Sequence, residues 1–326
     1  MKQIVSIRLV LVVCVFSMMI AAPLMGQEFP TRTIQIVGPF PPGGSTDLVA
    51  RILSPRLTEY LGKPVVVLNK AGAGGAVALQ FVAGSKPDGY TLITIPPNLV
   101  IIPFITPNVT FSYQDFQPVS LAVSMPYVTV VDAKSPWRAL EDLVDYGKKN
   151  PEKLNHGGAG AGAMSTFIGD WFSSAAGIKI TQIPYVGEGP ALVALLGGQA
   201  SFNCCSIPSA INYIKSGQVR VLAVMTPERY KGLPNVPTMG EKGYPDCTFI
   251  NWHMYMVPAK TPKHVVDKLA EAFQKVLREE DTIKALENVA SVVENRGPEE
   301  SMRILKNDDQ LWGNIIKRAG SINPGK

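Results

Sequence analysis

The sequence predicts an α/β protein of two lobes, in which helices cover the faces of mostly parallel sheets. Its 326 residues are enough for two domains of average size. Short β-rich runs alternate along the chain with stretches of helical periodicity. Two glycine-rich loops also stand in corresponding places in the two halves, each directly before a predicted helix. We therefore expect each half to form a small α/β unit.

The first unit is predicted to alternate strand and helix. Its first strand ends at Pro39, and a Pro-Pro-Gly-Gly turn follows. The helix after this turn has leucine and isoleucine residues on one face, and Gly62 marks its C-terminal end. In chain order we expect a strand at 33–38, a helix at 46–61, a strand at 65–69, a helix at 77–83 and a strand at 90–95.

The elements of the second unit and of the C-terminal third are predicted from the same kinds of signal. Ser135 and Pro136 indicate a helix start, because Ser caps helices and Pro suits the first helical position. In chain order we expect a β-rich stretch at 119–131, a helix at 135–149, a glycine-rich loop at 155–163, a helix at 165–176, a strand at 180–184, helices at 190–196 and 207–215, a strand at 219–225, and helices at 261–278, 282–288 and 298–318.

The last three helices have no predicted sheet of their own. They must pack on one of the two units, most simply on the first. The chain then crosses between the units near 117–131 and 249–258. This divides it into lobe 1, residues 27–122 and 252–326, and lobe 2, residues 123–251.

Residues 1–26 have the layout of a secretory signal peptide. Two basic residues precede the apolar run 9–20, and small residues follow it up to Gly26. The run is shorter than the roughly 20 residues of a membrane span. We expect cleavage near Gly26 and a periplasmic mature protein; an uncleaved N-terminal anchor is the alternative.

Composition excludes several classes of protein. Hydrophobic residues make up 46% of the chain and charged residues 17%, which excludes disorder, collagen and coiled coil as the main architecture. The net charge is +5, and +3 without the predicted signal peptide. This excess is too small and too scattered to indicate a nucleic-acid partner, although it does not repel small anions.

The two glycine-rich loops are the strongest candidates for a binding site. They lie at 39–47 and 157–166, each before a helix N-terminus. Glycine lets the backbone approach a ligand, and a helix N-terminus offers free N–H groups and a partial positive charge. Two such ends facing each other would hold an anion without Lys or Arg. The alternative is that both loops are ordinary turns, and we favour that structural interpretation for a third loop at 72–75.

Asp47 follows the first glycine loop and stands in the first turn of the predicted helix. It is interpreted as a helix cap, as a ligand contact or as a residue that orders the glycine loop. The interpretations differ in what the carboxylate contacts.

The sequence lacks the common catalytic and cofactor-binding motifs. No Lys follows the glycines as a P-loop requires, and the G-x-G-x-x-G, G-x-S-x-G and H-E-x-x-H patterns are absent. The three cysteines after the predicted signal peptide fit no zinc spacing and are expected to be free thiols. We expect no enzyme, no catalytic residue, no metal and no cofactor. Three histidines, interpreted as surface or structural residues, are His156, His253 and His264.

Residues 39–51 (PFPPGGSTDLVAR) resemble the signature of the Bug receptors, the extracytoplasmic solute-binding proteins of tripartite tricarboxylate transporters. Further matches span nearly the whole mature chain. They are, in order, 65–75 (VVVLNKAGAGG), 86–92 (KPDGYTL), 115–119 (DFQPV), the glycine loop 158–165, 183–187 (IPYVG), 195–199 (LLGGQ), 216–224 (SGQVRVLAV), 233–238 (LPNVPT) and 257–262 (VPAKTP).

The resemblance implies a type II periplasmic-binding-protein fold, with a ligand cleft between two α/β lobes that close on a hinge. It implies a monomeric, periplasmic receptor that captures a small organic carboxylate and delivers it to the membrane permease subunits of such a transporter. A carboxylate-sensing receptor that feeds a signalling partner is the alternative function.

The resemblance also assigns ligand-binding residues. The first-lobe residues are Phe40, Pro42, Gly43, Gly44, Ser45 and Asp47. The second-lobe residues are Gly160, Ala161 and Ser165. Further pocket candidates are Asn98, Tyr185 and Ser206.

The sequence departs from the family pattern in the second lobe. Thr166 stands where the family often has His, Val186 where it usually has Lys, and Ser201 where Asp is common. These changes remove charged groups, so we expect a ligand that is less polar or bulkier than a tricarboxylate, such as an aromatic acid or a mono- or dicarboxylate.

Overall fold

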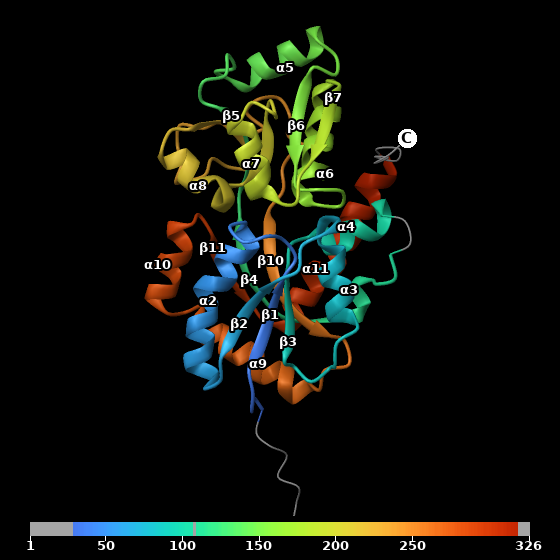
Figure 1. Cartoon of the computed structure of the whole chain (residues 1–326), viewed down its shortest axis with the longest axis vertical. Coiled ribbons are helices and arrows are strands. Elements are labelled where there is room, and N and C mark those ends of the chain that lie inside the picture. Colours follow the sequence, from blue (N-terminus) through green and yellow to red (C-terminus); the bar gives the residue numbers. More distant parts are fainter. Residues whose placement is uncertain (1–28, 107–108, 319–326) are drawn as a thin grey trace, which may run out of the picture.

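The computed structural model describes residues 29–106 and 109–318. The predicted signal peptide, 1–26, lies outside the described residues. The described chain forms two α/β lobes stacked end to end, and strands β4 and β10 run up the middle toward the junction (Figure 1). The predicted α/β class is confirmed.

Lobe 1 is built on a six-stranded sheet with the order β11-β4-β10-β3-β1-β2. β1 pairs in parallel with β2 and β3, whereas β10 runs antiparallel to β3 and β4, and β11 antiparallel to β4. The prediction of a mostly parallel sheet is therefore wrong. β4 takes the chain into lobe 2 and β10 brings it back, so these two neighbours must run in opposite directions. The strands are β1 (Ile34–Gly38), β2 (Val65–Asn69), β3 (Thr91–Ile95), β4 (Phe116–Met125), β10 (Asn251–Pro258) and β11 (Val292–Arg296).

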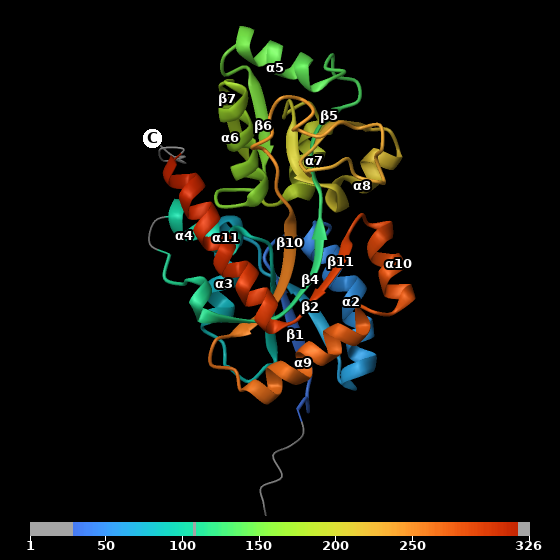
Figure 2. The same ribbon diagram turned by 180° about the vertical axis from the view of Figure 1, so that it is seen from behind.

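Helices cover both faces of this sheet. Alternating strand residues point to opposite sides: Ile36 and Leu92 pack with α2 and α9, while Val37 and Ile93 pack in the other cluster, with α3 and α4. The rear view shows α11 crossing the sheet and reaching the level of lobe 2 (Figure 2). The helices are α2 (Ser45–Leu61), α3 (Ala76–Ala83), α4 (Asn98–Ile105), α9 (Lys263–Val276), α10 (Glu280–Asn288) and α11 (Pro298–Arg318), with short turns η1 (Ala73–Gly75) and η2 (Tyr113–Asp115).

Lobe 2 has smaller sheets. β5 lies between β8 and β9 and is antiparallel to both, and β6 pairs with β7 in parallel. A single bridge between His156 and Phe202 joins the two groups. The elements are β5 (Tyr127–Asp132), α5 (Leu140–Lys149), β6 (Leu154–Gly158), α6 (Met164–Ala176), β7 (Ile180–Pro184), α7 (Glu188–Leu196), β8 (Asn203–Ser206), α8 (Ile207–Lys215) and β9 (Val219–Val224).

Several element predictions need correction. The predicted loop at 155–163 begins as a strand, because β6 finds a parallel partner in β7. The helix predicted from Ser135 starts at Leu140, since the Asp142 carboxylate accepts the backbone N–H groups of Arg138 and Ala139 at 2.8 and 3.0 Å and so fixes a later start. Helix α4 was not predicted, because a Pro interrupts its short apolar run.

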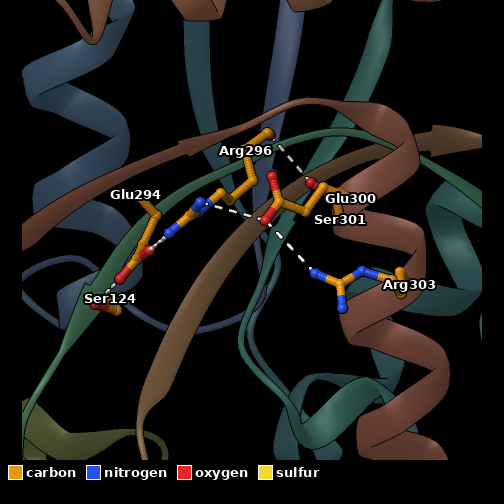
Figure 3. Close-up of polar contacts among 6 residues, drawn as sticks. All are labelled: Ser124, Glu294, Arg296, Glu300, Ser301 and Arg303. Carbon is orange, nitrogen blue, oxygen red and sulfur yellow. Dashed lines mark hydrogen bonds and ion pairs between the residues drawn. The ribbon is translucent and has the colours of Figure 1, made fainter.

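The C-terminal helices do pack on lobe 1, but the segment between them adds an unpredicted edge strand, β11. Polar contacts tie this strand to β4 and to the start of α11 (Figure 3). Ser124 of β4 donates to the Glu294 carboxylate at 2.7 Å, and Arg296 pairs with both Glu294 and Glu300. In β11 (VVENR) two valines precede three polar or charged residues, without the apolar–polar alternation of a half-buried strand. The sequence alone therefore does not predict this strand.

Candidate functional site

A small cavity lies between the two lobes. Its free volume of about 20 Å³ is enough for one water molecule. The lobes are therefore in contact, and a molecule of several carbon atoms needs them to part before it enters. From lobe 1 the lining residues are Phe40, Gly44, Ser45 and Pro96, and from lobe 2 they are Tyr127, Ala159, Ala163, Met164, Ser165 and Glu188. Asn251, the first residue of β10, lines the cavity at the crossing between the lobes.

Two helix N-termini meet at this cavity. α2 begins at Ser45 after the N-cap Gly44, and α6 begins at Met164 after the N-cap Ala163. Neither N-cap residue makes a side-chain hydrogen bond to its helix. First-turn amides without such a cap, together with the helix dipole, attract negative charge. The predicted pairing of the two glycine loops thus has the geometry of an anion site.

The loop before α2 is held in place by Asp47, which is only 2% exposed. Its carboxylate accepts hydrogen bonds from Gly43 N at 3.0 Å, Arg51 Nε at 2.9 Å and Asn69 Nδ2 at 3.0 Å. Burial alone would raise the pKa of Asp47, but these bonds and the Arg51 charge hold the pKa below its ordinary value. Of the three interpretations of Asp47, the structure supports the third: Asp47 orders the glycine loop.

The predicted site residues divide into those that line the cavity and those that support it. Phe40, Gly44, Ser45 and Ser165 line it. The Ser165 hydroxyl also accepts the backbone N–H of Ala159 at 2.8 Å, which fixes the second glycine loop. Residues of the set that do not line the cavity are Pro42, Gly43, Asp47, Asn98, Gly160, Ala161, Tyr185 and Ser206.

Some of these outer residues hold the loops that do line the cavity. Asn98 is fully buried and donates to the carbonyl of Gly74 at 2.5 Å. Tyr185 contributes its backbone N–H to the carbonyl of Gly158 at 2.8 Å. Ser206 lies behind the cavity, where its hydroxyl contacts Glu188. Their place in the structure is that of supports for the cavity wall.

The third glycine loop lies at the junction of the lobes. Gly74 has φ +63°, and a Cβ there would stand 2.2 Å from the carbonyl oxygen of Ala161 in lobe 2. Only glycine allows the two backbones to approach this closely. The structural interpretation of this loop is supported: the loop is part of the contact between the lobes and does not line the cavity.

A chain of hydrogen bonds links the lobes beside the cavity. Ser45 N donates to Ser209 Oγ at 3.0 Å, and Ser209 Oγ lies 3.0 Å from Ser206 Oγ. Ser206 has one hydroxyl hydrogen, which goes to Glu188 at 2.6 Å, so Ser209 is the donor in the middle bond. Tyr127 OH also donates to Glu188, at 2.5 Å.

Sequence reasoning missed five residues of this site. They come from four separate segments, and none belongs to a recognisable motif, so no sequence signal brings them together. Burial and the nearby Glu188 charge raise the pKa of Tyr127 well above its ordinary value, which keeps it a hydrogen-bond donor. Burial lowers the pKa of His253 to about 3, which keeps this ring neutral. The missed residues are Tyr127, Glu188, Ser209, Asn251 and His253.

The described residues include the three cysteines for which the sequence predicts no catalytic or metal-binding role. Cys204, Cys205 and Cys247 are buried and free, as predicted, and burial raises the pKa of the first and the last to about 12. Within residues 29–106 and 109–318, no group of three or more His, Cys, Asp or Glu side chains could hold a metal ion. The helices of this described part include none that is both long and apolar enough to cross a membrane.

The chain is similar to known proteins over most of its length. The family model described as "Tripartite tricarboxylate transporter family receptor" matches residues 49–321. The protein BugT of Bordetella pertussis is 32% identical over 93% of this chain and 94% of its own length. Sequence similarity alone thus extends over both lobes.

Solved structures match as well. The structure of periplasmic binding protein BugD superposes with a TM-score of 0.87 at 34% identity, over 90% of this chain and 99% of that one. The structure of MatC from Rhodopseudomonas palustris with bound malate gives 0.85 at 30% identity, over 88% of this chain and 100% of that one. These matches confirm the predicted periplasmic-binding-protein fold.

Proposed function

Because the chain belongs to the receptor family of the tripartite tricarboxylate transporters, we propose that it captures a small organic carboxylate in the periplasm and delivers it to the permease subunits of such a transporter. The observation that supports this most directly is that the N-termini of α2 and α6, whose N-cap residues make no side-chain hydrogen bond, lie on one cavity between the lobes. The related MatC has malate bound, which is an organic carboxylate.

In this proposal the two lobes capture the ligand by closing on it. The proposed lobes are residues 27–122 with 252–326 and residues 123–251, so the chain crosses between them within β4 and at the start of β10. The ligand enters when the lobes are apart, and closure brings the second helix N-terminus onto it. The closed form then presents a surface formed by both lobes, which the permease subunits recognise. The receptor acts as a monomer and needs no cofactor.

The proposed site has two layers. The lining residues Phe40, Gly44, Ser45 and Ser165 contact the ligand, with backbone amides supplying most of the hydrogen bonds. The remaining members of the predicted set hold these residues in position, as Asp47 does for the first loop. Gly160 and Ala161 approach the ligand through their backbone only.

A thermal-shift screen of residues 27–326 tests this function. The panel contains butyrate, benzoate, malate, adipate and citrate, with glucose as a neutral control. A ligand at about 100 times its Kd stabilises the folded state by about 2.7 kcal/mol, which is a readily measured rise in Tm. A selective rise with one or more acids is expected. No rise with any acid, in protein that has been unfolded and refolded to remove bound solute, would contradict the proposal.

A further inference from the structure

An acidic side chain lines the cavity that is proposed to hold an anion. Glu188 is the first residue of α7, and its carboxylate stands at the cavity wall of lobe 2. A carboxylate in such a place lowers the affinity for any second negative charge beside it. The hydrogen-bond partners of Glu188 indicate its role in the cavity.

Glu188 uses the donors of a small anion site. Its carboxylate accepts Tyr127 OH at 2.5 Å, Ser206 Oγ–H at 2.6 Å and Ser206 N–H at 3.3 Å. Ser206 is the N-cap residue of α8, so the positive end of that helix faces Glu188 as well. These groups would suit the carboxylate of a ligand, and the protein's own side chain already occupies them.

The charge of Glu188 has no basic partner. No ion pair joins it to a Lys, Arg or His within the described residues. The cavity lining contains no basic side chain, and Val186 stands two residues before Glu188. His253 is buried nearby, on the Ser45 side, and burial keeps its pKa at about 3, so it is neutral.

A second acceptor faces the same space. Asn251 is 1% exposed and lines the cavity, and its Oδ1 has no hydrogen-bond partner among the residues described. A buried amide oxygen without a partner is costly, so a bound molecule that donates to it gains affinity. The cavity thus has amide donors at two helix ends and acceptors at Glu188 and Asn251.

We propose that Glu188 determines specificity: it makes the cleft select a monocarboxylate whose other end carries a hydrogen-bond donor, such as an ammonium or hydroxyl group, over the dicarboxylate of equal length. The inference rests on the proposed function and adds the ligand class. The single carboxylate of the ligand lies at the ends of α2 and α6, and the donor group lies toward Glu188.

Matched acids test this by titration calorimetry. The four-carbon set is succinate, 4-hydroxybutyrate and 4-aminobutyrate, and the six-carbon set is adipate, 6-hydroxyhexanoate and 6-aminohexanoate. We expect the wild type to bind the hydroxy or amino acid of at least one set 10-fold or more tightly than its diacid. Glu188→Gln should reduce this preference at least 10-fold, and Glu188→Ala, which also frees Tyr127 and Ser206, should favour the diacid. Glu280→Gln is the control, because Glu280 is likewise the first residue of its helix but lies outside the cavity.

The outcomes separate the inference from the proposed function. A wild type that binds both succinate and adipate as tightly as their matched hydroxy and amino acids overturns the inference and leaves the proposed function standing. So does a preference that Glu188→Gln leaves unchanged. Failure of every acid to bind overturns the proposed function and the inference with it. The absence of a wild-type preference overturns the inference even where a variant does not fold.

Discussion

Ser45 of α2 and Ser209 of α8 form a buried hydrogen bond across the two lobes, from Ser45 N to Ser209 Oγ at 3.0 Å. The two residues are 164 positions apart. Ser45 is also one of the cavity-lining residues at the α2 N-terminus. The same residue therefore takes part in holding the lobes closed and in forming the proposed anion site, which couples ligand binding to closure.

Ser209→Ala should weaken ligand binding without changing selectivity. Removing Ser209 Oγ leaves the buried Ser45 N–H without its acceptor in the closed form, which costs about 1–3 kcal/mol and corresponds to roughly a 5- to 160-fold rise in Kd. Calorimetry with the best acid of the thermal-shift panel measures it. Ser216→Ala, at the exposed end of the same helix, is the control. An unchanged Kd in Ser209→Ala would mean that this bond plays no part in closure.

Gly74→Ala should hold the lobes apart. Its Cβ would stand 2.2 Å from the Ala161 carbonyl oxygen, so the closed contact cannot form without a shift. We expect a larger radius of gyration in X-ray scattering and at least a 10-fold loss of affinity. Gly84→Ala is the control, because a Cβ there meets only ordinary contacts, the nearest at 3.5 Å. A Gly74→Ala variant that still compacts on adding ligand contradicts the described closure.

Asp47→Ala should weaken binding by about 1–3 kcal/mol, because Gly43 of the first loop, Arg51 of α2 and Asn69 of β2 lose a buried acceptor. Stability should fall as well. Calorimetry and urea unfolding measure the two effects. Asp267→Ala, which removes an exposed pair with Lys263, is the control and should change neither by more than about 0.5 kcal/mol. Full affinity in Asp47→Ala would reduce this residue to a helix cap.

His156 should make the protein less stable in mild acid. Its Nε2 accepts the backbone N–H of Cys204 at 3.0 Å, and burial lowers its pKa to about 4. The unfolded chain takes up a proton near pH 6.5. The contribution of His156 is therefore complete above about pH 6.5 and is lost as the pH falls toward 4, by up to about 1.4 kcal/mol per pH unit.

Urea unfolding between pH 4 and 7 measures this slope. His156→Gln should reduce it to the part that buried His253 contributes, whereas His264→Gln, at an exposed position, should leave it unchanged. Equal slopes in the wild type and His156→Gln would mean that His156 gains its proton as readily when folded as when unfolded.

The sequence predicts those parts of the fold in which local pattern and tertiary context agree. β1 and α2 follow directly from an apolar run, a glycine turn and helical periodicity, and α11 spans the predicted 298–318. β11 could not be predicted, because its strand form comes from pairing with β4 and from the Glu294–Arg296 contacts. The antiparallel order of β4 and β10 likewise depends on the path between the lobes.

The candidate site divides in the same way. The glycine loops are contiguous in sequence, so their residues could be named in advance. Glu188 and Tyr127 could not, since α7 and β5 meet only when lobe 2 folds. Asp47 illustrates the intermediate case: its position was predicted, but whether it contacts the ligand or the loop depends on Asn69 and Arg51, which sequence alone does not place beside it.

The central claim is that the α2 N-terminus binds the carboxylate inside the cleft, and titration of one matched pair of variants tests it. Gly44→Val places side-chain bulk at the cavity wall, whereas Gly240→Val does so outside the cavity, where a Cβ likewise meets only ordinary contacts. With the panel acid that gives the largest shift in Tm, we expect wild-type affinity in Gly240→Val and no measurable binding by folded Gly44→Val. Wild-type affinity in Gly44→Val would contradict the account.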